Sequence, residues 1–222
     1  RQRMKNAAER SGRNIDEIKL IAVTKTHSLE IVEEALKFGI TAIGENKVQE
    51  AETKIPFLSN HHIEFHFIGH LQSNKIGKLM KLKPTLIHSI DSYHLAESLN
   101  SYLEKEESKQ DILVEVNITG EESKSGIHPQ QAIDLVKSIS ALPLVHIRGL
   151  MTIGLFDPDP EVTRPYFKQI RQLFDKIKGL DISNVDMEYL SMGMSDDFEI
   201  AIEEGSNLIR VGSAIFGPRH YG

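Results

Sequence analysis

The stretch "IKLIAVTKTHSLEIVEEALKFG", Ile18–Gly39, predicts one complete strand–helix unit. Its first part, Ile18–Lys25, contains the short apolar run that is typical of a buried parallel strand. In its second part, Ser28 is suited to cap a helix and Gly39 to end it. A lysine at the end of such a strand is either a solvated end or a functional group.

The same unit recurs along the chain, because amphipathic segments separate seven further apolar runs. The expected strands are Ile18–Lys25, Ala42–Asn46, Glu64–Gly69, Leu86–Asp91, Ile112–Asn117, Leu144–Ile153, Met187–Gly193 and Leu208–Phe216. Strict alternation of strands and helices implies a parallel sheet with right-handed crossovers, an α/β fold. Eight repeats favour a single (β/α)8 TIM barrel domain over residues 1–222. A doubly wound open sheet is the alternative.

Composition narrows the class of protein. The formal net charge is -6, which argues against a nucleic-acid partner. The chain has no cysteine, so disulfides and thiolate chemistry are excluded and a reducing compartment, the cytoplasm, is expected. No apolar run approaches the length of a membrane span, so no membrane partner is expected.

In a barrel of this kind the active face is the rim at the carboxyl ends of the strands. Polar and small residues gather at the expected strand ends: Lys25, Asn46, Gly69, His70, Ser89, Asp91, Asn117, Met151, Thr152, Ser191, Gly193, Arg210 and Gly212. The strand interiors stay apolar. This distribution predicts a ligand site at the rim.

Two stretches at this rim are suited to bind phosphate. "LSMGMSDD", Leu190–Asp197, and "IRVGSAIFG", Ile209–Gly217, each combine glycine with serine at a strand-to-helix turn. The residues concerned are Ser191, Gly193 and Ser195 in the first, and Arg210, Gly212 and Ser213 in the second. Either turn alone indicates little, but the loops after strands seven and eight often form the phosphate site of a barrel. Ser195 is also expected to cap the next helix.

Lys25 then gains a chemical role. An enclosed lysine can lose its proton and attack a carbonyl to form a Schiff base. Pyridoxal 5′-phosphate carries both a phosphate and an aldehyde and satisfies both features. Alternation does not decide whether Lys25 faces inward. A barrel enzyme acting on a sugar phosphate through Lys25 is an alternative.

Six motifs identify a resemblance that spans nearly the whole chain. They are "AVTKTH" (Ala22–His27), "IGENKVQE" (Ile43–Glu50), "FHFIGHLQSNK" (Phe65–Lys75), "IRGLMTIG" (Ile147–Gly154), "LSMGMSDDFEIAIEEGSNLIRVGSAIFG" (Leu190–Gly217) and the final "RHYG". In this order they resemble the pyridoxal phosphate homeostasis protein family, the proline synthetase co-transcribed group. The fold of that family is a single barrel of pyridoxal phosphate fold type III, similar to the N-terminal domain of alanine racemase.

The resemblance implies that Lys25 carries the cofactor as an internal aldimine. It also implies a set of cofactor-binding residues around it: Asn46, Ser191, Gly193, Ser195, Arg210, Gly212 and Ser213. The "HLQSNK" loop, His70–Lys75, would line the same mouth. Two positions depart from the family pattern, since His70 stands where proline is usual and Ser213 where threonine is common. The serine keeps the hydroxyl group.

Arg210 bears on the reaction. The resemblance to the racemases implies that this arginine faces the pyridine nitrogen and keeps it unprotonated. The ring is then a poor electron sink, which disfavours transamination and most decarboxylation and leaves racemisation or simple carriage of the cofactor. Racemisation needs a base on each face of the substrate, and nothing places a tyrosine opposite Lys25; the candidates are Tyr93, Tyr166, Tyr189 and Tyr221.

The resemblance therefore implies a protein of intracellular pyridoxal phosphate homeostasis with no established enzymatic activity. It would hold the cofactor and release it to apo-enzymes, as a monomer. A weak amino-acid racemase is the alternative. No metal site is predicted, because His62 and His66 would share a helix face but "EFHFIG" is expected to be a strand.

Overall fold

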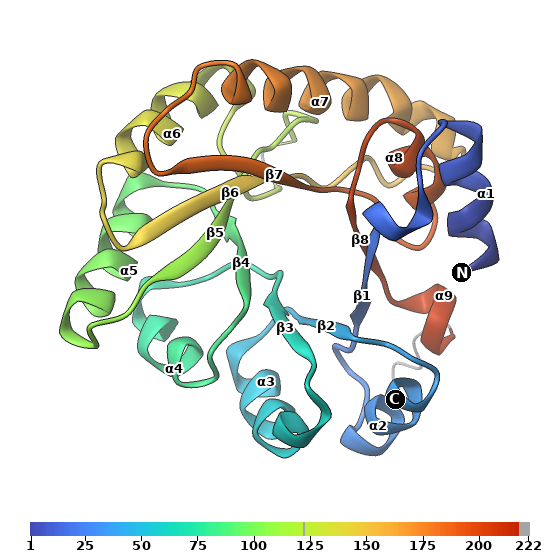
Figure 1. Cartoon of the computed structure of the whole chain (residues 1–222), viewed down its shortest axis with the longest axis horizontal. Coiled ribbons are helices and arrows are strands. Elements are labelled where there is room, and N and C mark those ends of the chain that lie inside the picture. Colours follow the sequence, from blue (N-terminus) through green and yellow to red (C-terminus); the bar gives the residue numbers. More distant parts are fainter. Residues whose placement is uncertain (122, 218–222) are drawn as a thin grey trace.

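Eight parallel strands close into a barrel in chain order, with β1 paired to both β2 and β8. The computed structural model describes residues 1–121 and 123–217 (Figure 1). The strands are β1 (Lys19–Val23), β2 (Ala42–Glu45), β3 (Glu64–Phe67), β4 (Leu86–Ile90), β5 (Gln110–Glu115), β6 (Val145–Met151), β7 (Val185–Ser191) and β8 (Leu208–Val211). The predicted TIM barrel is confirmed, and the open sheet is excluded because β8 returns to β1.

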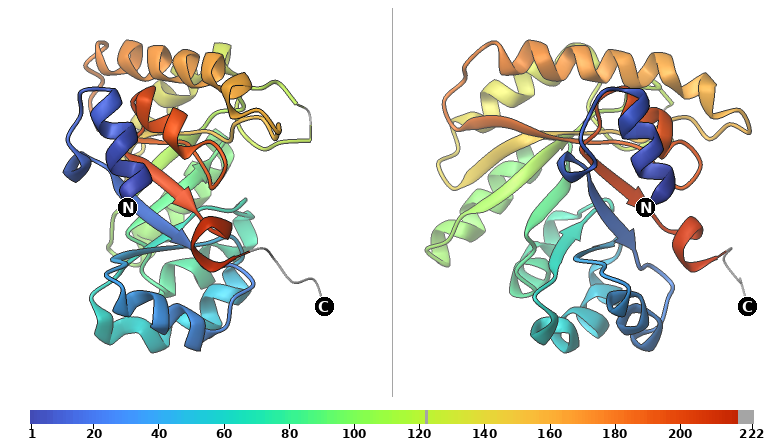
Figure 2. Two further views of the ribbon diagram at one scale, coloured as in Figure 1. Left: turned by 90° about the vertical axis from the view of Figure 1, so that its right-hand side faces the viewer. Right: turned by 45° about the vertical axis from the view of Figure 1, so that its right-hand side comes forward.

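Helices surround the barrel, as Figures 1 and 2 show. They are α1 (Gln2–Arg10), α2 (Leu29–Lys37), α3 (Val48–Lys54), α4 (Ile76–Lys81), α5 (Tyr93–Lys105), α6 (Ala132–Ser140), α7 (Arg164–Lys178), α8 (Phe198–Glu203) and α9 (Ser213–Phe216). Short 3-10 turns precede β1 and β3 and introduce α4, α6 and α7. Within the described ranges, no helix has both the length and the apolar character needed to cross a bilayer.

The core has layers on both sides of the strands. One cluster fills the barrel interior and consists of Ile21, Ala42, Leu86, Leu113, Met151 and Leu208. A much larger cluster lies between the outer faces of the strands and helices α3 to α8, and includes Phe67, Leu99, Val136 and Phe167. Burial of both faces explains why the strands are near-continuous apolar runs.

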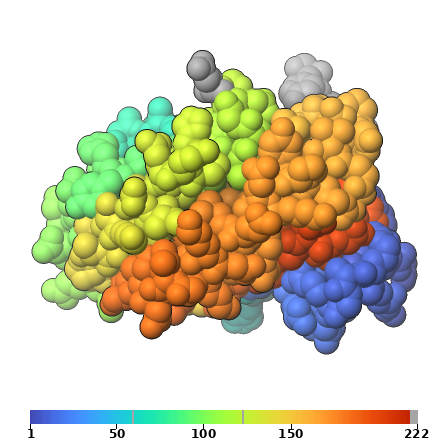
Figure 3. All heavy atoms as spheres, turned by 90° about the horizontal axis from the view of Figure 1, so that it is seen from above, coloured from blue at the N-terminus to red at the C-terminus, as the bar shows by residue number. Residues whose placement is uncertain are grey.

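Helix α1 lies against α8 beside the seam where β8 meets β1, as the neighbouring blue and red atoms of Figure 3 show. Its buried Met4, Ala7 and Ala8 share one cluster with Phe198 and Ile209. The alanines allow close approach of the two helices, and the helix thereby covers an apolar face that β8 and α8 expose.

The last predicted strand was too long. Leu208–Phe216 was expected to be extended, but β8 ends at Val211 and Ser213–Phe216 forms the short helix α9. The N–H groups of Ile215 and Phe216 both donate to the Gly212 carbonyl oxygen, at 2.9 and 3.0 Å. An apolar run of this length does not distinguish a strand from a strand followed by one helical turn.

The expected cap of α8 was also wrong. The helix begins at Phe198 rather than directly after Ser195, because Asp197 closes the preceding turn. Its Oδ1 accepts the N–H of Met194 at 2.6 Å. The Ser195 hydroxyl is therefore left to interact with another loop.

Candidate functional site

The carboxyl ends of β7, β8 and β1 lie side by side and bring the predicted site residues together. Ala22 of β1 pairs with Val211 of β8, so the turns that hold Lys25 and Gly212 adjoin. The Arg210 N–H donates to the carbonyl of Gly193 at 3.0 Å, which joins the turn after β7 to β8. Residues almost 200 positions apart in the chain thus share one rim.

Lys25 follows β1 by two residues and is half-buried. Its direction follows from its neighbours. Thr24 is fully buried, and its hydroxyl donates to Glu45 Oε1 at 2.6 Å on the helix side of the sheet. Ile21 belongs to the barrel interior and has the parity of Lys25. Because successive side chains of an extended chain point to opposite faces, the alternation up to Thr24 predicts that Lys25 faces the barrel mouth.

A buried ion pair supports the segment beneath Lys25. The Lys54 ammonium donates to the Glu45 carboxylate and to the Thr24 carbonyl, both at 2.8 Å. Burial raises the pKa of Glu45, and the hydrogen bonds from Lys54 and Thr24 oppose that rise. Thr26, which follows Lys25, has φ of 68°, and its N–H donates to the Glu50 carboxylate at 3.2 Å. The chain therefore makes a sharp turn immediately after Lys25.

Arg210 is buried below the rim on β8, with 4% of its surface exposed. Its Nη1 donates to the Ser191 hydroxyl at 2.6 Å and its Nη2 to the Thr152 carbonyl at 2.8 Å. Burial lowers the pKa of Arg210 to about 10, and the carboxyls of Asp197 and Glu115 oppose that change. The guanidinium therefore remains cationic at neutral pH, with its plane fixed at two points.

Ser191 is fully buried at the end of β7, where its oxygen lies 2.6 Å from Arg210 Nη1 and 2.9 Å from His88 Nδ1. Its observed contacts are with these two side chains. Ser191 was predicted to surround a cofactor, and the geometry makes it the support of the arginine.

Gly193 and Ser195 form the turn after β7. Gly193 has φ of 93°, and a Cβ placed there would lie 2.5 Å from the Ala201 Cβ. The Ser195 hydroxyl oxygen accepts the N–H groups of Gly212 and Ala214, both at 3.2 Å. Ser195 therefore ties the two candidate phosphate turns together, and its own hydroxyl hydrogen remains available to a ligand.

The remaining predicted residues lie at the margins of the same rim. Ser213 is exposed at the start of α9. Asn46 follows β2 and lines a cavity of about 450 Å³ together with His70, Gln72 and Lys75 of the "HLQSNK" loop. The loop begins close to Asn46, since a Cβ on Gly69 would lie 2.1 Å from the Asn46 carbonyl oxygen.

Three buried polar residues inside the barrel, Glu115, His66 and His88, were not predicted to belong to a site, whereas Ser89 was expected at the rim. Glu115, at the end of β5, has its pKa raised to about 7, chiefly by burial and then by Asp91. Ser89 on β4 is fully buried. His66 and His88 face each other inside the barrel with their ring nitrogens 2.9 Å apart. A polar residue in mid-strand among apolar neighbours was the available signal.

The candidate tyrosines do not gather opposite Lys25. Tyr189 lines a cavity at the amino-terminal end of the barrel, and Tyr93 is 41% exposed at the start of α5. Tyr166 belongs to the first turn of α7 and packs against the main core. Tyr221 and the rest of the "RHYG" end lie outside the described residues.

Comparison with known proteins settles the family. A family model described as "Alanine racemase, N-terminal domain" matches residues 1–220. The chain is 42% identical over 220 residues to a pyridoxal phosphate homeostasis protein of Aquifex aeolicus, covering 99% of this chain and 95% of the relative. The chain belongs to the pyridoxal phosphate homeostasis protein family. The Escherichia coli member is 39% identical, with 100% of this chain and 94% of that protein covered.

A solved structure of a relative agrees with this assignment. PipY of Synechococcus elongatus, with pyridoxal phosphate bound, has a TM-score of 0.83 and 31% identity, and the match covers 97% of this chain and 100% of PipY. An alanine racemase of Clostridium difficile has a TM-score of 0.76 at 14% identity. This second likeness concerns the fold, and it covers 56% of the racemase chain.

Proposed function

We propose that this chain binds pyridoxal 5′-phosphate reversibly at the carboxyl-end rim and serves intracellular homeostasis of that cofactor. Lys25 would hold the aldehyde carbon covalently, and the protein would release the cofactor to apo-enzymes of the cytoplasm. One observation carries the proposal: Lys25, the buried cation Arg210 and the Gly193–Ser195 turn lie at adjoining ends of β1, β8 and β7. The names of the relatives and the bound PipY structure support it.

The residues at the rim fit such a ligand. Among the described residues, Asn46 Oδ1 and Ser89 Oγ are buried without a hydrogen-bond partner. Buried polar atoms of this kind are commonly satisfied by a ligand or water. Gly193 has no room for a side chain, because α8 packs directly against it through Ala201 and Phe198, and this packing fixes the turn at the rim.

Each residue would have a distinct role. The bound cofactor supplies an aldehyde for covalent attachment and a pyridine ring whose reactivity depends on the protonation of its nitrogen. Lys25 provides the amine. Arg210, cationic and fixed by Ser191 and Thr152, would keep a proton off the ring nitrogen. The Ser195 hydroxyl would donate to the phosphate, since its oxygen already accepts two backbone N–H groups.

Carriage is favoured over racemisation. A two-base racemase needs an acid–base group on the face opposite Lys25. Tyr189 lies at the other end of the barrel and Tyr166 packs from α7 against the main core, so neither is placed for that role. We therefore propose that the single domain of residues 1–222 acts as a carrier and does not turn over amino acids.

The test is a visible spectrum followed by borohydride reduction and peptide mapping of the purified protein. We expect a yellow protein and a pyridoxyl adduct on Lys25. Lys25→Ala should lose both, whereas Lys47→Ala, which removes an exposed lysine beside Asn46, should keep both. A protein that stays colourless with added cofactor would refute the proposal.

A second assay separates carriage from turnover. The loaded protein is mixed with an apo-enzyme that requires pyridoxal phosphate, and separately with L-amino acids. Recovery of the enzyme's activity without D-amino acid formation supports the carrier. Formation of D-amino acids that is lost in Lys25→Ala would support the racemase.

A further inference from the structure

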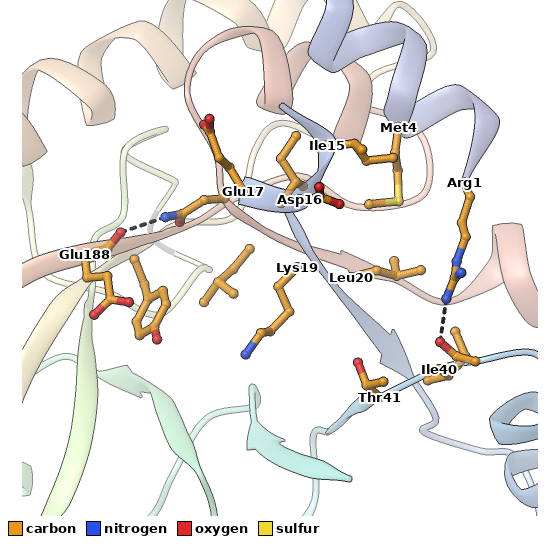
Figure 4. Close-up of a pocket in the computed structure, with 15 residues that line it drawn as sticks. Arg1, Met4, Ile15, Asp16, Glu17, Lys19, Leu20, Ile40, Thr41 and Glu188 are labelled. Atoms are coloured by element: carbon orange, nitrogen blue, oxygen red, sulfur yellow. Dashed lines mark hydrogen bonds between the residues drawn. The ribbon is translucent and has the colours of Figure 1, made fainter. Parts of the chain in front are cut away.

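A continuous series of hydrogen-bonded polar side chains runs through the barrel interior from one end to the other. At the amino-terminal end, Lys19 Nζ of β1 contacts the two carboxylate oxygens of Glu64 on β3 at 2.5 and 2.6 Å. Lys19 lines a cavity of about 690 Å³ at this end, where its side chain is drawn and labelled in Figure 4.

The series of hydrogen bonds continues through two histidines. Glu64 Oε2 lies 3.1 Å from His66 Nε2, and His66 Nδ1 lies 2.9 Å from His88 Nε2 on β4. His88 Nδ1 lies 2.9 Å from the hydroxyl of Ser191 on β7. Since β4 and β7 are not neighbours in the barrel, this last contact crosses its interior. Ser191 then meets Arg210 at 2.6 Å.

The two ends fix which atom donates at every contact. The hydrogen bond from His66, and then that from Lys19, lowers the pKa of Glu64 to about 2, so this carboxylate is ionised and accepts only. At the other end the guanidinium of Arg210 donates only. Ser191 must accept from Arg210, and Glu64 must accept from His66.

The histidines between these ends are buried, with 2% of His66 and 0% of His88 exposed. Burial lowers the pKa of both rings, so both are neutral at pH 7. A neutral ring has one donor and one acceptor nitrogen. His66 Nε2–H therefore donates to Glu64, His88 Nε2–H to His66 Nδ1, and the Ser191 hydroxyl to His88 Nδ1. Both histidines carry their hydrogen on Nε2.

We infer that His66 and His88 are positioning residues, which act through Ser191 to hold Arg210 and couple it to the Lys19–Glu64 ion pair at the opposite end of the barrel. The inference rests on the proposed function for the role of Arg210 toward the cofactor. The polar side chains of the barrel interior would then support the site from the opposite end of the barrel. Every hydrogen bond between Arg210 and Glu64 runs in the same direction, so the orientation of the Ser191 hydroxyl depends on a carboxylate three hydrogen bonds away.

The first test uses the cofactor-free full chain and needs no ligand. Two-bond ¹H–¹⁵N spectra at pH 7.5 report the protonation of each histidine nitrogen. We expect the hydrogen on Nε2 of both His66 and His88. A hydrogen on Nδ1 of either ring, or a cationic ring, overturns the inference.

The second test compares variants by their dissociation constants for pyridoxal 5′-phosphate and by the absorption spectrum of the bound cofactor. His88→Leu should weaken binding about tenfold, because the Ser191 hydroxyl loses its acceptor. His88→Gln can donate to His66 and accept from Ser191, and should recover most of the affinity. His146 is a half-buried histidine that pairs with Asp111 and takes no part in this series of hydrogen bonds. His146→Gln should therefore change neither the dissociation constant nor the spectrum. Wild-type affinity in His88→Leu overturns the inference.

A remote variant keeps the inference testable if His88→Leu does not fold. Glu64→Ala removes the final acceptor at the far end and should shift the His88 ring signals and weaken binding roughly threefold to tenfold. Glu188→Ala removes another carboxylate of that end, which pairs with Arg148. This variant should change neither the His88 ring signals nor the affinity for the cofactor. An unchanged His88 signal and affinity in Glu64→Ala overturn the inference.

The outcomes separate the two proposals. If the wild-type protein binds no pyridoxal phosphate, the proposed function and the coupling to it fail together, whatever the tautomers are. If it binds normally and the tautomers are reversed, this inference alone fails.

Discussion

At the scale of the residue, Glu115 is a buried carboxyl whose folded pKa of about 7 exceeds the ordinary value of 4.5. The folded state binds the proton more tightly than the unfolded state does, so the stabilising effect is complete below pH 4.5 and is lost as pH rises through 7. Between these limits the free energy of unfolding should fall by about 3 kcal/mol. Glu115→Gln should remove this fall, as measured by urea unfolding from pH 4.5 to 8.

The control for Glu115 is Glu104→Gln on the exposed side of α5. Its stability curve should run parallel to that of the wild type over the same pH range. If Glu115→Gln also runs parallel, burial does not hold the proton on Glu115.

Single residues differ in how far sequence revealed them. The positions of Lys25 and Arg210 at the rim were predictable because each is a cation at the end of an apolar strand, where the rim of a barrel must be. His66, His88 and Glu115 were not, since their roles depend on which strands face each other across the interior. Alternation gives the face of a strand, but it does not give the partner on the opposite wall.

At the scale of the element, the turn from β7 to α8 depends on Gly193. Gly193→Ala places a Cβ within 2.5 Å of Ala201 and imposes strain at φ of 93°. We expect a loss of about 2–4 kcal/mol in the free energy of unfolding. Gly12→Ala is the matched control: its φ is 68° but no atom lies within 4 Å of the added Cβ, so only the strain of about 1 kcal/mol applies. Equal losses in urea unfolding would contradict the packing argument.

Helix α8 is also held at its end by Arg13. The guanidinium Nη1 donates to the carbonyls of Ile202 and Ser206 at 2.9 and 2.7 Å, and so joins the last turn of the helix to the loop that follows it. Arg13→Ala should cost about 2 kcal/mol in thermal or urea unfolding. Arg3→Ala removes an exposed ion pair with Glu199 and should cost under about 1 kcal/mol. A smaller loss in Arg13→Ala than in Arg3→Ala would contradict this assignment.

Element boundaries were less predictable than element types. All eight strands were found from apolar runs, yet α9 was taken for the end of β8 because Ile215 and Phe216 continue the run. The Ser195 cap failed for a related reason. Asp197 lies two residues later and accepts the hydrogen bond that closes the turn. The Ser195 hydroxyl instead accepts from Gly212 and Ala214 of a different loop, and this contact depends on the tertiary structure.

At the scale of the whole molecule, the candidate site spans the seam where the first and last strands close the barrel. Lys25 follows β1, while Arg210 and Gly212 belong to β8 and its turn. A ligand that contacts all three stabilises barrel closure, because it binds the folded state and not the separated strands. At a hundredfold excess over its dissociation constant, pyridoxal 5′-phosphate should add about 2.7 kcal/mol to the free energy of unfolding.

For a chain of this size that gain corresponds to a rise of roughly 5–10 °C in melting temperature. Hydrogen exchange should slow at the amides of β1, β7 and β8, where the ligand joins the two ends of the chain, and remain unchanged along the far helix α5. In Lys25→Ala the covalent attachment is lost, so the same cofactor concentration should give a smaller rise. An equal rise in Lys25→Ala, with protection spread evenly over the barrel, would show that binding occurs away from this seam.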